Sequence, residues 1–230
     1  MTIWAIVPAA GIGSRMASAD SNSPPKQYRE LLGKTVLAHS LQRLLAVAEI
    51  EHIFVALHAA DQYWPQSDEA LHSRISSVPG GAERMHSVLS ALRAISTAQA
   101  DDWVLVHDAV RPCVDPADIE RLISELAEHP VGGLLAAAMD NTVKKADAGF
   151  NVTETIDRNS LFNALTPQMF RYELLLNALE NCAENGWPVT DEASALEMNA
   201  AVPKLVIGSK LNIKITHETD LALAEKLLAG

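Results

Sequence analysis

The stretch IWAIVPAAGIGSRM, residues 3–16, joins an apolar run to a glycine-rich turn. The apolar run predicts a buried strand, and it ends in Ala-Ala-Gly, where no side chain can fill space. Gly11 and Gly13 are then followed by a cation, Arg15. Two interpretations fit these residues about equally well: a tight turn beside a surface arginine, or a loop whose space is filled by an anionic ligand.

The rest of the chain alternates between strand and helix patterns. Apolar runs predict strands at Ile3–Val7, His52–Leu57, Arg74–Val78, Trp103–His107, Gly133–Ala138 and Lys204–Ile207. Helical periodicity appears at Val36–Ala48, Glu83–Ile95, Pro116–Glu128, Tyr172–Asn185 and Glu218–Leu228. The strand runs are continuously apolar, so both faces of the sheet are expected to be covered. The predicted fold class is α/β, a doubly wound and mostly parallel sheet.

Ligands on such sheets bind beyond the carboxyl ends of the strands. VPAAG at 7–11 is one predicted strand end, and VHDAVRP at 106–112 is another. Asp108 and Arg111 therefore follow the same strand, at the edge of the sheet where the glycine turn is also expected. Two interpretations explain these two residues equally well. They form either a local ion pair, or a Mg²⁺-binding carboxylate beside a phosphate-binding arginine. Together with the glycine turn and Lys26, the second interpretation makes a pocket for phosphates.

Composition and charge limit the classes of function. The chain has 230 residues, 48% of them hydrophobic and 20% charged, which is typical of a soluble globular protein. Its net charge of −11 lacks the basic face that a nucleic-acid binder needs. No apolar run is long enough to span a membrane, and no secretory signal is evident. Cys113 and Cys182 have neither metal-ligand spacing nor disulfide density, so we expect a cytoplasmic protein.

Two segments interrupt the alternation. Residues 18–27, SADSNSPPKQ, are polar and interrupted by proline, which predicts a loop. Residues 141–158 alternate apolar and polar around an Asp-Ala-Gly turn, which predicts a projecting β-hairpin with little apolar surface. A lone hairpin is marginally stable in water, so we expect this arm, at about 139–158, to pack on a second subunit. The chain is otherwise expected to form a single domain over residues 1–230.

Several familiar motifs fail on inspection. GIGSRM has only the first two glycines of a dinucleotide-binding fingerprint, because Met16 occupies the third position. Gly33-Lys34-Thr35 resembles the end of a P-loop, but Tyr28 stands where the first glycine is required. The histidines are scattered, and His107 is expected to be a core residue rather than a nucleophile. These observations disfavour nicotinamide and flavin sites, P-loop enzymes and histidine-based catalysis.

Seven segments in order carry a resemblance to a known family: VPAAGIGSRM, PPKQY, GGAERMHSV, VHDAVRP, DRNSLFNALTPQ, TDEASALE and NIKIT. The chain resembles the 2-C-methyl-D-erythritol 4-phosphate cytidylyltransferases of the non-mevalonate isoprenoid pathway, over nearly its whole length. The resemblance implies a Rossmann-like nucleotidyltransferase fold. It also implies transfer of CMP from CTP to methylerythritol phosphate, with release of pyrophosphate and with Mg²⁺ or another divalent cation as cofactor.

The resemblance assigns roles residue by residue. Arg15 and Lys26 match the pair that stabilises the transition state, and Arg158 and Lys214 match groups that position the acceptor phosphate. The CTP site would be formed by Pro8, Ala9, Ala10, Gly11, Gly13, Gly80, Gly81, Ser87, Asp108 and Ala109, with Asp108 also binding the metal. The methylerythritol phosphate site would be formed by Arg111, Thr142, Arg158, Thr166, Lys214 and Thr216. In the family the arm brings Thr142 and Arg158 to the active site of the partner in a homodimer.

The chain departs from the family pattern at Ala82, where an acidic residue usually follows the two glycines, and in a longer loop at 18–25. Read without the resemblance, Lys214 is a lysine on an edge strand that prevents strand pairing. Thr190 is a helix cap, with Asp191 and Glu192 complementing the helix dipole. Two alternative functions stay open: a related cytidylyltransferase acting on ribitol phosphate or another sugar phosphate, and a non-catalytic nucleotide-binding module.

Overall fold

A computed structural model describes residues 2–11 and 24–229 of the chain. Its centre is a seven-stranded sheet in the order β11-β7-β10-β6-β1-β4-β5. The strands are β1 (Ile3–Pro8), β4 (Ile50–Leu57), β5 (Ile75–Pro79), β6 (Trp103–Val106), β7 (Gly132–Ala138), β10 (Phe162–Arg171) and β11 (Lys204–Ile207). All pairs are parallel except those that β10 makes with β6 and β7. The predicted α/β fold with a mostly parallel sheet is confirmed.

Strand β10 is the one member of the sheet that the sequence patterns did not predict. It contains Pro167, which lacks an N–H and usually excludes a segment from the middle of a sheet. The structure accommodates it because the pairing with β7 is interrupted between Ala164 and Gln168. Asn163, Thr166 and Gln168 add further polar character to this strand. The interruption lies beside Asp108 at the end of β6, where Thr166 accepts a hydrogen bond from the Asp108 backbone N–H.

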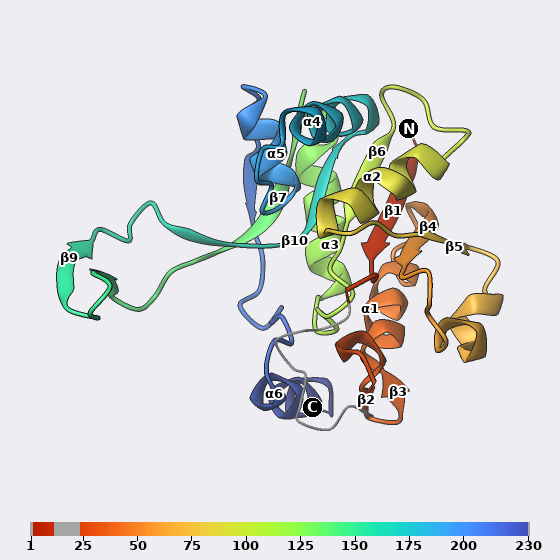
Figure 1. Cartoon of the computed structure of the whole chain (residues 1–230), viewed down its shortest axis with the longest axis horizontal. Helices are drawn as coiled ribbons and strands as arrows, with labels where there is room; N and C mark the ends of the chain where they lie inside the picture. Colours follow the sequence, from red (N-terminus) through yellow and green to blue (C-terminus); the bar gives the residue numbers. More distant parts are fainter. Residues whose placement is uncertain (1, 12–23, 230) are drawn as a thin grey trace.

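Helices cover both faces of the sheet (Figure 1). Helices α1 (Val36–Leu45) and α3 (Pro116–Leu126) bury their apolar sides against one face, in a core that includes Leu41, Trp103 and Leu122. Helices α2 (Arg84–Ala94), α4 (Tyr172–Asn185) and α5 (Glu192–Met198) cover the other face, around Leu92 and Phe170. Among the helices of the described ranges, none has the length and apolarity that crossing a bilayer requires.

A smaller layer lies at one end of the molecule. Helix α6 (Glu218–Ala229) packs near the short hairpin of β2 (Glu30–Leu31) and β3 (Lys34–Thr35), which precedes α1. Gly33, at the turn of this hairpin, has a φ of 78°, and Thr35 caps α1 by accepting from the backbone N–H of Ala38. The Gly-Lys-Thr sequence therefore forms the turn of a hairpin and a helix cap, and the exclusion of a P-loop agrees with this structure.

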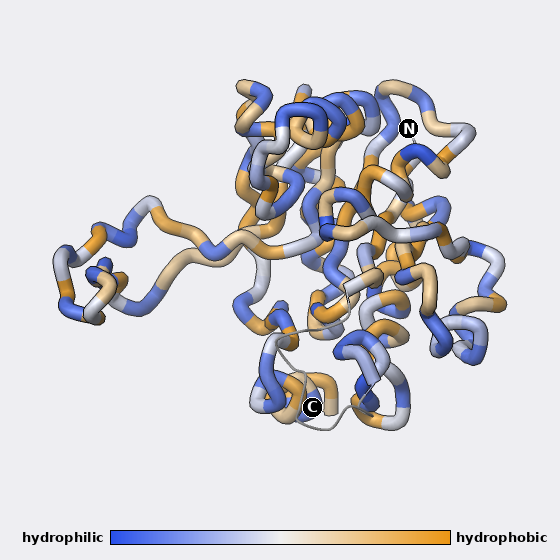
Figure 2. The backbone as a smooth tube through the Cα atoms, viewed as in Figure 1, coloured by the Kyte–Doolittle hydropathy of each residue, from blue (hydrophilic) through white to orange (hydrophobic). Residues whose placement is uncertain are grey.

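The arm projects from the body as a two-stranded hairpin, β8 (Val143–Ala146) and β9 (Val152–Ile156) (Figure 1). Asp147 stabilises its turn by accepting from the backbone N–H groups of Gly149 and Asn151. Hydrophobic and hydrophilic residues alternate irregularly along the arm (Figure 2), and Phe150 at its tip is 91% exposed. The predicted hairpin is confirmed, and its apolar groups have no core of their own to enter.

Two local expectations prove wrong. The cap of α5 is Asp191 rather than Thr190: its side chain accepts from the backbone N–H of Ser194, and the Ser194 side chain completes a capping box. Lys214 does not lie on an edge strand, because residues 212–216 run in irregular structure beside the ends of the central strands. Tertiary contacts, described below, explain why Glu192 and Lys214 stand where they do.

Candidate active site

The main pocket opens at the carboxyl ends of β1 and β6, as the strand-end argument predicts. It is lined by Pro8, Ala9, Ala10, Gly11, Lys26, Gln27, Gly81, Ala82, Glu83, Arg84, Ser87, Asp108, Ala109, Val110 and Lys214. Most of the predicted CTP-binding residues are in this set, together with the predicted catalytic lysines. Gly13 and Arg15 lie outside the described residues, so their predicted roles stay predictions.

The side chain of Gln27 stabilises the turn after β1 by hydrogen bonds. The buried amide of Gln27 donates to the carbonyl oxygens of Ala9 (2.8 Å) and Gly11 (3.2 Å). The Ala9 N–H donates in turn to Ala56 at the end of β4 (2.8 Å). Among residues 2–11 and 24–229, no atom would lie within 4 Å of a Cβ atom added at Gly11. With respect to the described part of the chain, the small residues of the turn therefore border open space, as a ligand-binding loop requires.

The Gly80-Gly81 segment forms the wall opposite this turn. An added Cβ on Gly80 would come 2.4 Å from the Cβ of Ala10, and one on Gly81 would come 2.3 Å from that of His86. Ser87 fixes the segment, because its hydroxyl accepts from the N–H of Gly81 (3.0 Å) and donates to the carbonyl of Glu83 (3.2 Å). Both glycines are thus required by close approach, and Ser87 fixes this wall of the pocket.

Asp108 is the centre of a cluster of cations. Its Oδ1 accepts from Nε of Arg84 (3.0 Å), and its Oδ2 lies 2.8 Å from Nζ of Lys214 and 3.4 Å from Nε of Arg111. Burial alone would raise the pKa of Asp108, but the charges of Arg84 and Lys214 hold it well below its usual range. The local pair with Arg111 exists, but it is the longest of three. Asp108 is therefore ionised and organises the cations around it.

The backbone of Asp108 is tied to β10 through His107. The Asp108 N–H donates to Oγ1 of Thr166 (3.1 Å), which lies 3.0 Å from Nδ1 of His107. Nε2 of His107 lies 3.1 Å from the carbonyl oxygen of Arg111, so a neutral imidazole with its proton on Nε2 satisfies every group. Burial lowers the pKa of His107 to about 4. His107 is thus the core residue that was expected.

A second cavity adjoins the first and shares Lys214 with it. Arg111, Asp140, Lys210 and Asn212 also line this cavity. The Arg111 guanidinium donates to the carbonyl of Asn212 (2.7 Å), while the Asn212 amide donates to that of Thr166 (2.7 Å). These bonds bring Arg111 and Thr166 together through Asn212, and Lys214 lines the same cavity as Arg111. All three are predicted to bind methylerythritol phosphate.

Thr216 and the residues of the arm complete the predicted set. The Thr216 carbonyl accepts from Nζ of Lys26 (3.0 Å), which joins the 212–216 segment to the main pocket. Thr142 and Arg158 are exposed at the base of the arm, and neither lines either cavity of its own chain. The structure therefore brings together all the described site residues except these two.

Sequence reasoning missed two charged residues. Arg84, the first residue of α2, lines the pocket and binds both Asp108 and Glu192. Glu192 was interpreted as a residue that complements a helix dipole, but its side chain is 1% exposed and paired with Arg84 at 2.6 Å. A cation at a helix N-terminus is electrostatically unfavourable, and that was the available signal for Arg84.

Comparison with known proteins shows the family to which the chain belongs. Residues 3–230 match the family model of 2-C-methyl-D-erythritol 4-phosphate cytidylyltransferase (IspD). The enzyme of that name from Vibrio parahaemolyticus is 50% identical over 225 residues, which are 98% of this chain and 94% of the relative. The crystal structure of the Francisella tularensis enzyme has a TM-score of 0.85 at 38% identity and covers 99% of this chain and 100% of its own. The chain belongs to the 2-C-methyl-D-erythritol 4-phosphate cytidylyltransferase family.

Proposed function

We propose that the main pocket binds CTP and the adjoining cavity binds methylerythritol phosphate, for the reaction that defines the family. That reaction transfers CMP from CTP to 2-C-methyl-D-erythritol 4-phosphate and gives 4-diphosphocytidyl-2-C-methyl-D-erythritol and pyrophosphate. The observation that carries the assignment is the position of Lys214. It lies on the wall common to both cavities, beside Asp108, where two phosphates would meet.

The chemistry needs charge neutralisation rather than a base. A phosphate oxygen of methylerythritol phosphate, already ionised near neutral pH, attacks the α-phosphorus of CTP. A new P–O bond forms, and the bond from the α-phosphorus to the bridging oxygen of pyrophosphate breaks, with the electron pair leaving on pyrophosphate. No proton needs to move, which agrees with a buried and neutral His107. The protein aligns two polyanions and stabilises the charge that grows on the transferred group.

The residues divide this work. Lys26 and, by resemblance, Arg15 stabilise the transition state, while Pro8, Ala9, Ala10, Gly11 and Gly13 surround the triphosphate. Gly80, Gly81, Ser87 and Ala109 form the nucleoside side of the pocket. Arg111, Thr166, Lys214 and Thr216 bind the acceptor, with Lys214 and Arg158 orienting its phosphate. The close approach of Gly80 to Ala10 and the position of Lys214 support this division.

Asp108 fits the binding of Mg²⁺ between protein and phosphates. Mg²⁺ is commonly held by one or two carboxylates plus substrate phosphates, and within residues 2–11 and 24–229 no cluster of three or more acidic, histidine or cysteine ligands offers another site. The three cations described around Asp108 leave part of its roughly four lone-pair positions for a metal. When bound, the ion would offset phosphate charge.

The exposed arm supports a homodimer in which Thr142 and Arg158 serve the active site of the partner. Phe150 and Val152 are 91% and 62% exposed, and a hairpin of this size needs a surface to pack on. Both cysteines are free thiols, which agrees with a reducing cytoplasm as the location.

Pyrophosphate release with CTP and methylerythritol phosphate tests the function. We expect release that depends on both substrates, and much slower release with ribitol phosphate or with ATP as the donor. Preference for ribitol phosphate would favour a related cytidylyltransferase instead. CTP binding without turnover of any acceptor would favour a non-catalytic nucleotide-binding module.

A further inference from the structure

Arg84 lies between two carboxylates, one inside the nucleotide pocket and one outside it. Its Nε donates to Asp108 (3.0 Å), while its Nη1 and Nη2 donate to the two carboxylate oxygens of Glu192 (2.6 and 3.0 Å). The bidentate face of the guanidinium is thus turned away from the pocket, and Asp108 receives a single N–H. Burial lowers the pKa of Arg84, but the charges of Glu192 and Asp108 outweigh it and raise the pKa above its usual value.

Glu192 is held in place by a network of its own. It is the first residue of α5, and the capping box of Asp191 and Ser194 fixes that end of the helix. Gln168 on β10, itself 1% exposed, donates to Oδ2 of Asp191 (2.8 Å) and accepts from the N–H of Ala193 (2.8 Å). The carboxylate is therefore anchored to the central sheet through α5 and β10.

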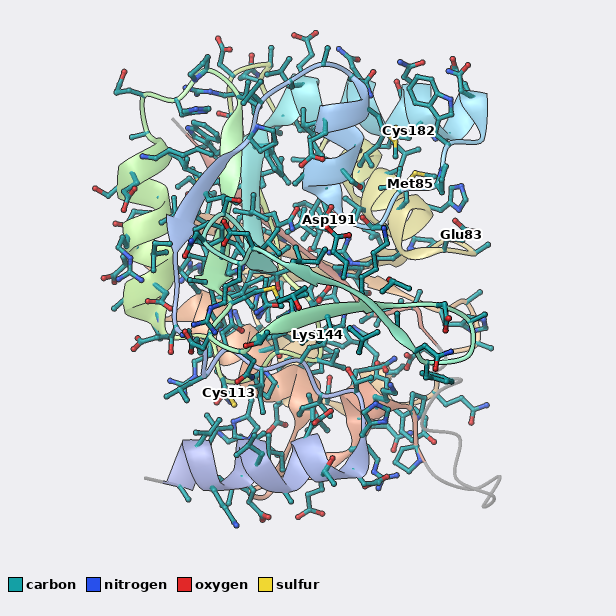
Figure 3. The ribbon with its side chains drawn as sticks, turned by 90° about the vertical axis from the view of Figure 1, so that its left-hand side faces the viewer. Glu83, Met85, Cys113, Lys144, Cys182 and Asp191 are labelled. Atoms are coloured by element: carbon teal, nitrogen blue, oxygen red, sulfur yellow. The ribbon has the colours of Figure 1, made fainter. Side chains whose placement is uncertain are left out.

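The pair joins the starts of two helices that are far apart in sequence. Glu83 and Met85 flank Arg84 at the start of α2, and Asp191 precedes Glu192 at the start of α5; these three are labelled in Figure 3. A buried carboxylate is stable only when it is paired and hydrogen-bonded, so the fit between these two side chains is specific. None of the chemistry assigned above uses the charge of Glu192.

We propose that Glu192 is a positioning residue for cytidylyl transfer. It holds the Arg84 fork away from the phosphates of the bound nucleotide and limits Asp108 to one N–H from Arg84. The proposal rests on the proposed function, since it assigns the pocket to CTP. Because its fork is paired with Glu192, Arg84 contributes little to ground-state binding of a polyanion, although it lines the pocket. Binding energy is then kept for groups that act in the transition state.

Glu192→Gln removes the negative charge and keeps the size of the side chain. The new amide would direct an N–H at the guanidinium, so the two-bond grip would be lost. Arg84 would then be free to turn its fork toward Asp108 or toward a phosphate. This adds ground-state attraction for CTP and disturbs the alignment of Asp108, so affinity and turnover should change in opposite senses.

The test compares CTP binding without metal, by calorimetry in EDTA, with steady-state kinetics. For E192Q we expect a Kd for CTP lower by roughly threefold or more and a kcat lower by about tenfold. In an Arg84→Gln background, adding E192Q should leave the Kd unchanged, because the cation on which Glu192 acts is gone. A merely structural role would lower the active fraction without tightening metal-free binding.

The matched control is Glu180→Gln, which breaks another glutamate–arginine pair made by α2. Arg93 and Glu180 are 2.8 Å apart, their side chains are 60% and 36% exposed, and neither residue lines the pocket. This variant should resemble wild type in both measurements. If E192Q does not fold, Glu192→Asp keeps the charge but withdraws the carboxylate, and it should lower kcat with a smaller change in Kd.

An unchanged or weaker Kd for E192Q, or an unchanged kcat for Glu192→Asp, would overturn the proposal. So would tightening that persists in the Arg84→Gln background. Failure of the proposed function would look different, because wild type itself would then neither bind CTP nor release pyrophosphate.

Discussion

Gly11 borders the space that the proposed triphosphate occupies, and its substitution separates folding from binding. An added Cβ meets no atom of the described residues within 4 Å, and the backbone is outside the left-handed region. Gly11→Ala should therefore unfold at about the same denaturant concentration as wild type, or be stabilised by about 0.5 kcal/mol through the unfolded chain. The KM for CTP should rise about tenfold or more, because the methyl group occupies space meant for phosphate.

Gly80→Ala is the contrasting variant. Its Cβ would lie 2.4 Å from that of Ala10, so the strand ends must separate, and the free energy of unfolding should fall by about 1–3 kcal/mol. Urea titrations and CTP saturation curves of both variants make the comparison. A Gly11→Ala enzyme with unaltered CTP affinity would show that the space beyond the turn does not belong to the nucleotide.

At the scale of elements, strands β6 and β10 meet at a proton-sensitive junction. His107, at the end of β6, is buried and neutral between Thr166 of β10 and the Arg111 carbonyl. Its pKa is about 4 in the folded protein, against an ordinary value near 6.5 in the unfolded chain. Below about pH 6.5 the unfolded state binds a proton that the folded state resists. This contribution to stability is therefore complete above pH 6.5 and is lost as the pH falls toward 4.

The expected loss is about 3 kcal/mol of unfolding free energy between pH 6.5 and 4. Urea unfolding across this range should show the slope, and His107→Gln, less stable at pH 7.5, should show a shallower one. Carboxylates such as Asp108, whose pKa is lowered in the folded state, lose their contribution to stability chiefly below about pH 4, outside the window. Equal slopes for the two proteins would mean that His107 does not resist protonation.

At the scale of the whole molecule, the arm is expected to serve the active site of a second subunit. Thr142 and Arg158 are exposed at its base and outside both cavities of their own chain, whereas Lys26 lines the pocket. If arms exchange between two subunits, each active site combines Lys26 of one chain with Arg158 of the other. Lys26→Ala and Arg158→Ala should each be inactive alone, and their mixture should regain activity.

The expected recovery follows from random pairing. About half the dimers are mixed after dissociation and reassociation, and each mixed dimer has one site with both residues intact and one with neither. Activity should return to about a quarter of wild type. If Arg158 acts within its own chain, every site lacks one residue and no activity returns, provided that subunit exchange is confirmed by a tag on one variant.

Much of this architecture follows from local sequence. Continuous apolar runs indicated β1, β4, β6, β7 and β11, because a strand covered on both faces needs apolar residues at every position. Their carboxyl ends then had to share an edge, which placed Asp108 near the Ala-Ala-Gly turn before any contact was known. The arm was likewise predicted from its alternation and its turn, which are properties of a single segment.

Tertiary structure alone decided what no segment contains. Strand β10 enters the sheet antiparallel despite Pro167, because its neighbours β6 and β7 supply pairing on both sides of the interruption. Arg84 and Glu192 are 108 positions apart, and burial next to an opposite charge, rather than a helix dipole, explains both. Lys214 forms an ion pair with Asp108 and does not lie on an edge strand of the sheet. Local periodicity reports which side of an element faces the core, whereas the pairing of charges depends on which elements the fold brings together.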